Sequence, residues 1–277
     1  SYNSYYHYNK EMKIFKNKKK LQKKIKDNKS ISFVPTMGGL HKGHISLIKK
    51  AKNIGDNTLV SIFINPKQFD DKRDYLKYPR NLKKDLSKLR GLKIDYVFIP
   101  NKKEIFSFKP KHKIYLDNFS KKLCGLSRKG HFRGVVNIVN RFLEIIKPKK
   151  IFLGNKDYQQ LYLISKHILK RKIKTAVVKC STVREKNGIA CSTRNFLLSK
   201  NQQIIGSKIY RYLIESKKKR FINKKKLKND ILNIGAKKID YLEIYNIKTH
   251  KKTIFNDKNS KIFIAYYLDD IRLIDNF

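Results

Sequence analysis

The stretch VPTMGGLHKGH, residues 34–44, joins a strand-like run to a helical pattern through a glycine-rich turn. Residues 32–35 are typical of a strand, and three of the chain's 12 glycines, Gly38, Gly39 and Gly43, follow within six residues. Glycines after a strand let the backbone turn tightly and approach a ligand closely. The helix that follows directs its N-terminal N–H groups and the positive end of its dipole toward that ligand. The stretch therefore predicts an anion-binding turn at the start of a helix.

Two histidines in this turn, His41 and His44, are three residues apart and so share one face of the first helical turn. Two imidazoles above a helix N-terminus suit a polyphosphate, because they can stabilise charge on phosphoryl oxygens. The alternative is a pair of surface or capping histidines beside a flexible loop. We favour the polyphosphate interpretation, because H-x-G-H directly follows a strand and two glycines.

Strand-like and helix-like segments alternate on both sides of this turn, which favours an α/β fold. Alternation of this kind indicates a Rossmann-like parallel sheet with helices on both faces. Ligands of such sheets bind beyond the carboxyl ends of the strands. Further strands are expected over residues 59–64, 94–99, 151–153 and 176–178, and helices over residues 44–52, 82–91 and 134–146 and around Leu161, Ile164 and Ile168.

Beyond residue 180 the pattern changes to that of a smaller C-terminal α+β domain. A helical region over residues 207–234, interrupted by the lysine-rich residues 217–226, precedes strand candidates at residues 241–245 and 262–268. We therefore expect a nucleotide- and substrate-binding domain over residues 12–180 and a lid domain over residues 181–277. Residues 1–11 are rich in Tyr and Asn without apolar periodicity and are expected to be an extension.

The composition indicates a folded protein, since 40% of the 277 residues are hydrophobic and 12% are aromatic. No apolar run approaches the roughly 18 residues that span a bilayer, and no apolar segment typical of a secretory signal follows the N-terminus. The three cysteines, Cys124, Cys180 and Cys191, form no C-x-x-C pair. We expect reduced thiols in a cytoplasmic protein, without a membrane partner.

The net charge of +46 comes from 67 basic and 21 acidic residues, and it invites a nucleic-acid-binding interpretation. Only 12 of the basic residues are arginines, however, and arginine is the side chain favoured for bidentate phosphate and base recognition. The excess lysine accompanies Ile, Asn, Tyr and Phe, which all have A/T-rich codons. We therefore attribute the charge to coding bias and expect no specific nucleic-acid partner.

Seven ordered motifs resemble those of the pantoate–β-alanine ligase family within the H-x-G-H nucleotidyltransferase superfamily. The resemblance runs from about Met12 to Phe277, and seven motifs at compatible spacing are far more specific than H-x-G-H alone. The motifs are VPTMGGLHKGH (34–44), SIFINPKQF (61–69), YPRNLKKDL (78–86), RKGHFRGV (128–135), GNKDYQQL (154–161), VREKNGIACSTRN (183–195) and RLIDN (272–276).

The resemblance implies an Mg²⁺-dependent ligase that condenses pantoate with β-alanine in two steps, through a pantoyl adenylate made from ATP. It also implies a homodimer. Both nucleophiles then belong to substrates, which agrees with the lack of a convincing Ser or Cys nucleophile in the sequence. The task of the protein becomes positioning and charge stabilisation.

The resemblance also implies roles for individual residues. It makes His44 the proton donor, with His41 beside it on the phosphates, Gln68 and Gln160 the ligands of pantoate and β-alanine, and Asp85 a carboxylate linked to Mg²⁺. The ATP-binding residues that it implies are Met37, Gly38, Gly39, Leu40, His41, Lys42, Gly43, His44, Gly154, Asn155, Lys156, Asp157, Val183, Cys191, Ser192, Thr193 and Arg194.

Several positions depart from the family pattern. Lys42 stands where an acid is commoner, Asn155 replaces a glutamate and Lys129 replaces a proline. Cys191-Ser-Thr replaces a run that ends in Ser-Ser. We expect these changes to affect the affinity for ATP more than the reaction, and Asn155 most, since a lost carboxylate weakens metal or ribose binding.

Two alternatives stay open from the residues alone. Another H-x-G-H nucleotidyltransferase would join a nucleotide to a phosphorylated acceptor, and its pocket would need cations where Gln68 and Gln160 stand. A basic RNA-binding protein would show aromatic residues interleaved with a basic stripe, and the sequence shows no such pattern.

Overall fold

The computed structural model describes residues 11–28, 30–69 and 72–277. The expected N-terminal extension, residues 1–11, therefore lies outside the described residues apart from Glu11.

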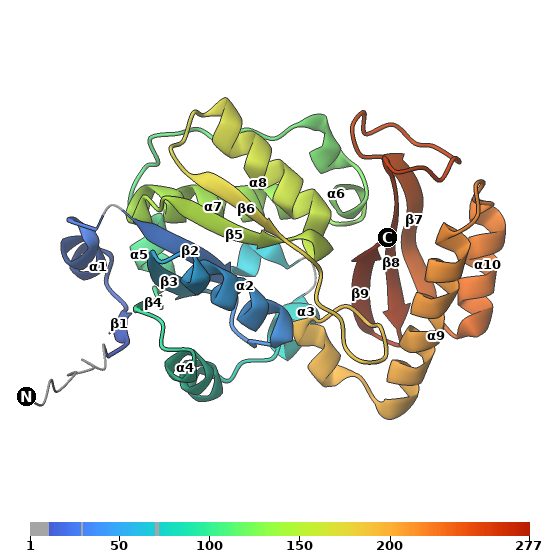
Figure 1. Cartoon of the computed structure of the whole chain (residues 1–277), viewed down its shortest axis with the longest axis horizontal. Helices are drawn as coiled ribbons and strands as arrows, with labels where there is room; N and C mark the ends of the chain where they lie inside the picture. Colours follow the sequence, from blue (N-terminus) through green and yellow to red (C-terminus); the bar gives the residue numbers. More distant parts are fainter. Residues whose placement is uncertain (1–10, 29, 70–71) are drawn as a thin grey trace, which may run out of the picture.

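A six-stranded parallel sheet forms the larger part of the molecule (Figure 1). Its strand order is β1-β4-β3-β2-β5-β6, and every neighbouring pair runs parallel. The predicted α/β class is thus confirmed. The strands are β1 (Lys13–Phe15), β2 (Ile31–Thr36), β3 (Asn57–Ile62), β4 (Tyr96–Phe98), β5 (Lys150–Gly154) and β6 (Ala176–Cys180).

Helices cover both faces of this sheet (Figure 1). One face packs on α7 (His131–Ile146) and α8 (Tyr158–Lys170) in a core that includes Phe33 and Phe142. The other face packs on α2 (Lys42–Asn53) and α4 (Leu82–Gly91). Shorter helical segments fill the connections: α1 (Lys18–Ile25), η1 (Pro66–Gln68), α3 (Lys72–Lys77), α5 (Lys102–Phe106), η2 (Asn118–Lys121), α6 (Cys124–Ser127), η3 (Asn155–Asp157) and η4 (Thr193–Leu197).

The strand order reverses between β2 and β5, which are neighbours in the sheet although β3, β4 and several helices lie between them in the chain. Chain segments leave the carboxyl ends of these two strands in opposite directions, so a crevice opens there. The glycine-rich turn follows β2, and the short helical turn η3 follows β5. The topology alone therefore brings two of the predicted ATP-binding segments together.

A second, antiparallel sheet forms the C-terminal part, in the order β7-β8-β9. Its strands are β7 (Lys238–Asn246), β8 (Ser260–Leu268) and β9 (Ile271–Asn276). Two helices, α9 (Lys200–Lys217) and α10 (Lys224–Ile234), pack on it around a separate core. The edge strand β9 faces the larger sheet domain (Figure 1).

The predicted elements agree in kind with those observed, and they differ at their ends. The lysine-rich interruption is shorter than expected, because α10 begins at Lys224, inside it. The sequence pattern indicated no strand at β1 or β9, and the C-terminal helical region begins at Lys200, seven residues before the predicted residue 207. No helix among the described residues has the length and apolar character to cross a bilayer.

Candidate active site

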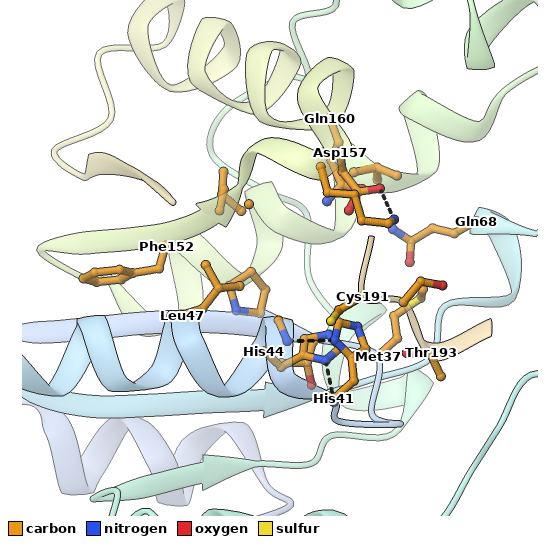
Figure 2. A pocket seen from close by; sticks show the side chains of 18 of the residues that line it. Met37, His41, His44, Leu47, Gln68, Phe152, Asp157, Gln160, Cys191 and Thr193 are labelled. Carbon is orange, nitrogen blue, oxygen red and sulfur yellow. Dashed lines mark hydrogen bonds and ion pairs between the residues drawn. The ribbon is translucent and has the colours of Figure 1, made fainter. Parts of the chain in front are cut away.

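A cavity of about 240 Å³ lies at the carboxyl ends of β2 and β5, where the strand order reverses. Figure 2 shows His41 and His44 on one side of it, and Gln160 and Asp157 on the opposite side. Fourteen of the predicted binding residues line this cavity: Met37, His41, Gly43, His44, Gln68, Gly154, Lys156, Asp157, Gln160, Val183, Cys191, Ser192, Thr193 and Arg194.

The glycine-rich turn is packed so closely that side chains would not fit at two of its positions. Gly39 has a φ of +59°, and a Cβ there would lie 2.3 Å from Cγ2 of Thr193. At Gly43 a Cβ would lie 2.7 Å from Cε1 of His41. The hydroxyl of Thr193 donates a hydrogen bond of 3.1 Å to the carbonyl of Gly39. The glycines therefore let the turn, the His41 ring and the segment around Thr193 come together.

The two histidines cap α2, and this fixes where each ring carries its proton. His41 is the N-cap residue, and its Nδ1 accepts a hydrogen bond of 3.0 Å from the N–H of Gly43. The Nδ1 atom of His44 accepts one of 3.3 Å from the N–H of His41. A neutral imidazole that accepts at Nδ1 carries its proton on Nε2. Each ring therefore keeps an Nε2–H for another acceptor.

Burial keeps both imidazoles neutral. It lowers the pKa of His41 to about 2, with His44 and Lys156 contributing in the same direction. Burial also lowers the pKa of His44 to about 4, although the nearby Asp157 carboxylate opposes the shift. The capping bonds require acceptor nitrogens, so the electrostatics and the hydrogen bonds agree. Near pH 7 the pair can donate hydrogen bonds without carrying charge.

The opposite wall consists of Gly154 and the turn η3 at the start of α8. The ammonium of Lys156 lies 3.6 Å from Oδ1 of Asp157, and both side chains line the cavity. Lys156 also acts electrostatically on the two histidines, since its charge lowers the pKa of each. This wall can therefore neutralise an anion that the histidines bind.

A third wall comes from residues 181–194, after β6. Arg194 lines the cavity, but its guanidinium already forms a bidentate ion pair with Asp74 of α3, at 2.6 and 3.1 Å. The guanidinium of Arg194, a predicted ATP-binding residue, is thus engaged with a carboxylate in this structure. The thiol of Cys191 lies 3.4 Å from Oε1 of Glu185, and burial raises its pKa to about 11. Cys191 is therefore a thiol and no nucleophile near pH 7.

The two glutamines reach the cavity from different elements, Gln68 from η1 and Gln160 from the first turn of α8. The backbone carbonyl of Gln68 accepts hydrogen bonds from Nη2 of Arg128 at 2.8 Å and from His131 at 2.9 Å. The motif RKGHFRGV, to which both donors belong, thus fixes the short η1 turn. These hydrogen bonds fix the backbone of Gln68, and its side-chain amide lines the cavity.

An apolar wall lies beside the glutamines, and the sequence analysis missed it. It comes mainly from α7, eleven of whose sixteen residues are buried. A helix with so many apolar positions has more than the one face that a core needs, and this excess is the signal that could have found the wall. The lining residues of this wall are Phe63, Val135, Ile138, Val139, Phe142 and Ile164. Tyr78, Ser181 and Thr182 also line the cavity and were not predicted.

Five predicted ATP-binding residues do not line the cavity. Gly38, Gly39 and Leu40 lie behind the turn, in buried positions. The Lys42 ammonium points elsewhere and pairs with Glu185 at 2.7 Å. Asn155 contributes its backbone carbonyl to a contact with Asn276, described below. These residues shape the turns instead of lining the cavity.

Asp85 has a different environment from the one that an Mg²⁺ ligand needs. It is 3% exposed, and its two oxygens accept hydrogen bonds of 2.9 Å from the N–H groups of Gly39 and Leu40. Mg²⁺ is usually held by one or two carboxylates together with substrate phosphates. Among residues 11–28, 30–69 and 72–277, no three His, Cys, Asp or Glu side chains form a group that could hold a metal. The Asp85 carboxylate therefore does not fit a resident Mg²⁺ site.

Comparison with known proteins gives a consistent result across most of the chain. A profile of the family described as pantoate–beta-alanine ligase matches residues 10–277. A pantothenate synthetase of Fervidobacterium nodosum is 38% identical over 270 residues, which cover 93% of this chain and 95% of that protein. One from Francisella tularensis subsp. novicida is 40% identical over 257 residues, covering 91% and 90%.

Solved structures agree with the sequence relatives. The pantoate–beta-alanine ligase of Francisella tularensis, complexed with beta-gamma ATP and beta-alanine, superposes with a TM-score of 0.83 at 39% identity and covers 96% of this chain and 97% of its own. The pantothenate synthetase of Thermus thermophilus has a TM-score of 0.86 at 28% identity, covering 96% and 99%.

Proposed function

Because the chain belongs to the pantoate–β-alanine ligase family, it joins pantoate to β-alanine at the expense of ATP, and we propose that it does so in two steps through a pantoyl adenylate. A carboxylate oxygen of pantoate attacks the α-phosphorus of ATP, and the bond to pyrophosphate breaks. The amine of β-alanine then attacks the acyl carbon and loses a proton, while the bond to AMP breaks. Each bond is made by a substrate atom, so the protein needs no covalent nucleophile.

One observation carries this proposal: a single cavity is lined by both histidines, by Lys156 and by both glutamines. The first three groups suit phosphate, and the two amides suit a small hydroxy acid, since an amide both donates and accepts. The adenylation step needs both partners within reach of each other. A cavity that joins the two kinds of group supplies that proximity.

We assign His41 and His44 to the phosphates of ATP, as neutral donors through Nε2–H. Charge on the phosphoryl oxygens grows as the bond to pyrophosphate breaks, and fixed donors in a site with little water stabilise it. In this role His44 donates a hydrogen bond through the transition state. The positive charge comes from Lys156 and, after release from Asp74, from Arg194.

We assign pantoate to the space between the glutamines and α7. Pantoate carries two methyl groups on one carbon, and the apolar side chains Val135, Ile138 and Val139 offer them a dry surface. β-Alanine has a route through a second cavity of about 120 Å³, which shares Met37, Gln68 and Gln160 with the first. The complex of the Francisella tularensis relative with beta-gamma ATP and beta-alanine supports ATP and β-alanine as substrates.

Three features of the family enter as proposals. Mg²⁺ would accompany ATP and be held through its phosphates, with Asp157 as the one carboxylate that lines the cavity within the described part of the chain. Residues 12–180 and 181–277 would act as two units, the second closing over the first as a lid. Two copies of the chain would form a homodimer.

The exchange of radiolabelled pyrophosphate into ATP tests the adenylate step without β-alanine. We expect exchange that requires pantoate and stops when pantoate is omitted. Exchange that ignores pantoate would contradict the adenylate mechanism. Pantothenate formation without any exchange would instead indicate that no separate pantoyl adenylate forms during the reaction.

A further inference from the structure

The last strand of the chain, β9, ends on a side chain that reaches across to the larger domain. Asn276 is 5% exposed, and its Nδ2 donates hydrogen bonds of 2.9 Å to the backbone carbonyls of both Asn155 and Lys156. Its Oδ1 accepts a hydrogen bond of 2.8 Å from Nζ of Lys261. Both ends of the amide are therefore engaged, and its donor end holds η3, the turn that presents Lys156 to the cavity.

This turn lacks the usual side-chain caps. Gly154, the N-cap residue of η3, makes no side-chain cap hydrogen bond, and neither does Asp157, the N-cap residue of α8. Helix starts in this chain are otherwise capped by side chains in many places, for example by Asn81 in α4 and by Ser199 in α9. A short turn without its own caps depends more on contacts from outside. Asn276 supplies such a contact from 120 residues away.

The neighbouring residue anchors the same strand to another cavity wall. Asp275 accepts hydrogen bonds of 2.6 and 3.0 Å from the guanidinium of Arg184, which precedes the cavity-lining residues 191–194. β9 is the edge strand of its sheet, on the side that faces the larger domain (Figure 1). Two consecutive residues of β9 thus tie the small sheet to two of the three segments that carry predicted ATP-binding residues.

We propose that Asn276 is a positioning residue for the adenylation step: it holds the Asn155–Asp157 turn so that Lys156 meets the phosphates of ATP. The contact makes the phosphate-binding turn depend on the docking of the C-terminal sheet. The contact also gives Asn155 a role that needs no carboxylate, because Asn276 binds the backbone carbonyl of Asn155. This inference rests on the proposed function, because it assumes that Lys156 binds ATP.

The variant Asn276→Asp separates the two ends of this side chain. An aspartate still accepts from Lys261, but it presents an oxygen to two carbonyl oxygens and loses both donations. We expect kcat/KM for ATP in the exchange assay to fall about 10- to 100-fold, as for two lost buried hydrogen bonds.

A matched control is available within the same domain. Nδ2 of Asn256 also donates to two backbone carbonyls, those of Lys217 and Lys219, but it lies outside both cavities. We expect Asn256→Asp to lower the melting temperature and to leave kcat/KM for ATP unchanged. If Asn276→Asp does not fold, Asn276→Ala, which removes the donors without adding charge, takes its place.

A double-mutant cycle with Lys156→Met shows whether Asn276 acts through Lys156. We expect Asn276→Asp to have no further effect on kcat/KM for ATP in the Lys156→Met background. Additive effects of the two changes, or normal kcat/KM for ATP in Asn276→Asp, would overturn the proposal. Absence of pantoate-dependent exchange in the unmodified protein would instead overturn the proposed function, so the two failures are distinguishable.

Discussion

The two histidines of the glycine-rich turn cap a helix and line the cavity at the same time. Serine, threonine, aspartate or asparagine would cap α2 equally well. A histidine cap differs because its second ring nitrogen remains as a rigid donor on the far side of the ring. His41 and His44 form a reciprocal capping box in which both Nδ1 atoms accept backbone N–H groups. Capping therefore sets the tautomer that phosphate binding needs.

Substitutions of His44 can separate capping from catalysis. A glutamine amide reaches about as far as Nε2, and an asparagine amide about as far as Nδ1. We expect His44→Asn to keep the cap and the melting temperature but to lower kcat by about 10²-fold or more, as we also expect for His44→Ala. His44→Gln should keep more of kcat and lose stability. Steady-state kinetics and thermal unfolding of the three variants measure kcat and the melting temperature. Equal kcat values for His44→Asn and His44→Gln would contradict the assigned tautomer.

Asp85 stabilises the glycine-rich turn from behind, because its carboxylate accepts the N–H groups of Gly39 and Leu40. Asp85→Asn would place an amide N–H against one of these donors, and we expect it to cost about 1–3 kcal/mol in the free energy of unfolding. kcat/KM for ATP should fall, and raising the Mg²⁺ concentration should not restore it.

Glu104→Gln serves as the control for Asp85→Asn. Glu104 also accepts a backbone N–H, that of Lys18 at 2.8 Å, but it lies outside the cavity. We expect it to leave kcat/KM for ATP unchanged. Recovery of the Asp85→Asn activity at high Mg²⁺ would support a metal-binding role for Asp85 instead.

Among individual residues, the polar part of the site could be predicted from the sequence better than its apolar part. Gln160 and Lys156 line the cavity, and the family motifs, not their chemistry alone, marked them in the sequence. Val135 and Val139 look the same whether they face a core or a ligand, so the apolar excess of α7 indicates a second apolar face without showing which residues form it. Two arginines within the motifs, Arg184 and Arg272, pair with Asp275 and Asp240. Those two arginines hold the C-terminal sheet.

At the scale of elements, α7 serves both the core and the cavity, and two of its positions separate these tasks. Val139 lines the cavity, and Leu143, one turn further on, does not. We expect Val139→Ala to raise KM for pantoate about 10-fold or more, with KM for ATP unchanged. Leu143→Ala should lower the free energy of unfolding by about 2–5 kcal/mol and leave both KM values unchanged. We check both variants by initial rates at varied pantoate and ATP concentrations and by urea unfolding. If Val139→Ala leaves KM for pantoate unchanged, pantoate binds elsewhere.

Helix and strand ends were less predictable than the elements themselves. The start of α7 at His131 precedes the predicted residue 134, because Gly130, in a left-handed conformation with no side-chain cap, begins it. For α9 a usable signal was overlooked, since Ser199 and Gln202 have the S-x-x-Q spacing of the capping box that the structure contains. The strand β9 is short and mixed in polarity, and its pairing with β8 decides its structure.

At the scale of the whole molecule, the charge of +46 does not concentrate at the cavity. Of the lysines and arginines that the structure describes, only Lys156 and Arg194 line it. Most lysines are spread along exposed positions of many elements, for example Lys19 and Lys20 in α1. A distribution of this kind agrees with coding bias, and the site works with few cations and neutral histidines.

Buried neutral histidines give the folded chain a specific pH dependence. Burial lowers the pKa of His131 to about 3 and those of His44 and His167 to about 4. The unfolded chain, with pKa values near 6.5, takes up protons that the folded chain does not. The stability is therefore fully present above pH 6.5 and is lost as the pH falls from there toward about 4, by about 1.4 kcal/mol per pH unit for each such histidine.

Urea unfolding between pH 4 and pH 8 measures this dependence, and His167→Gln tests its origin. His167 is buried away from the cavity, between Asn140 and the backbone of Tyr115. We expect a shallower loss of stability below pH 6.5 in this variant. The same slope as in the unmodified protein would mean that acidic side chains, and not the histidines, set the pH dependence.

The proposed function requires one cavity to hold the phosphate of ATP and pantoate together. A crystal structure of the protein with ATP and pantoate, without β-alanine, measures this directly. We predict pantoyl adenylate in the cavity, with its phosphate within hydrogen-bond distance of Nε2 of His44 and its methyl groups against α7. Pantoate and nucleotide bound in separate places, or Nε2 of both histidines turned away from the phosphate, would contradict the account.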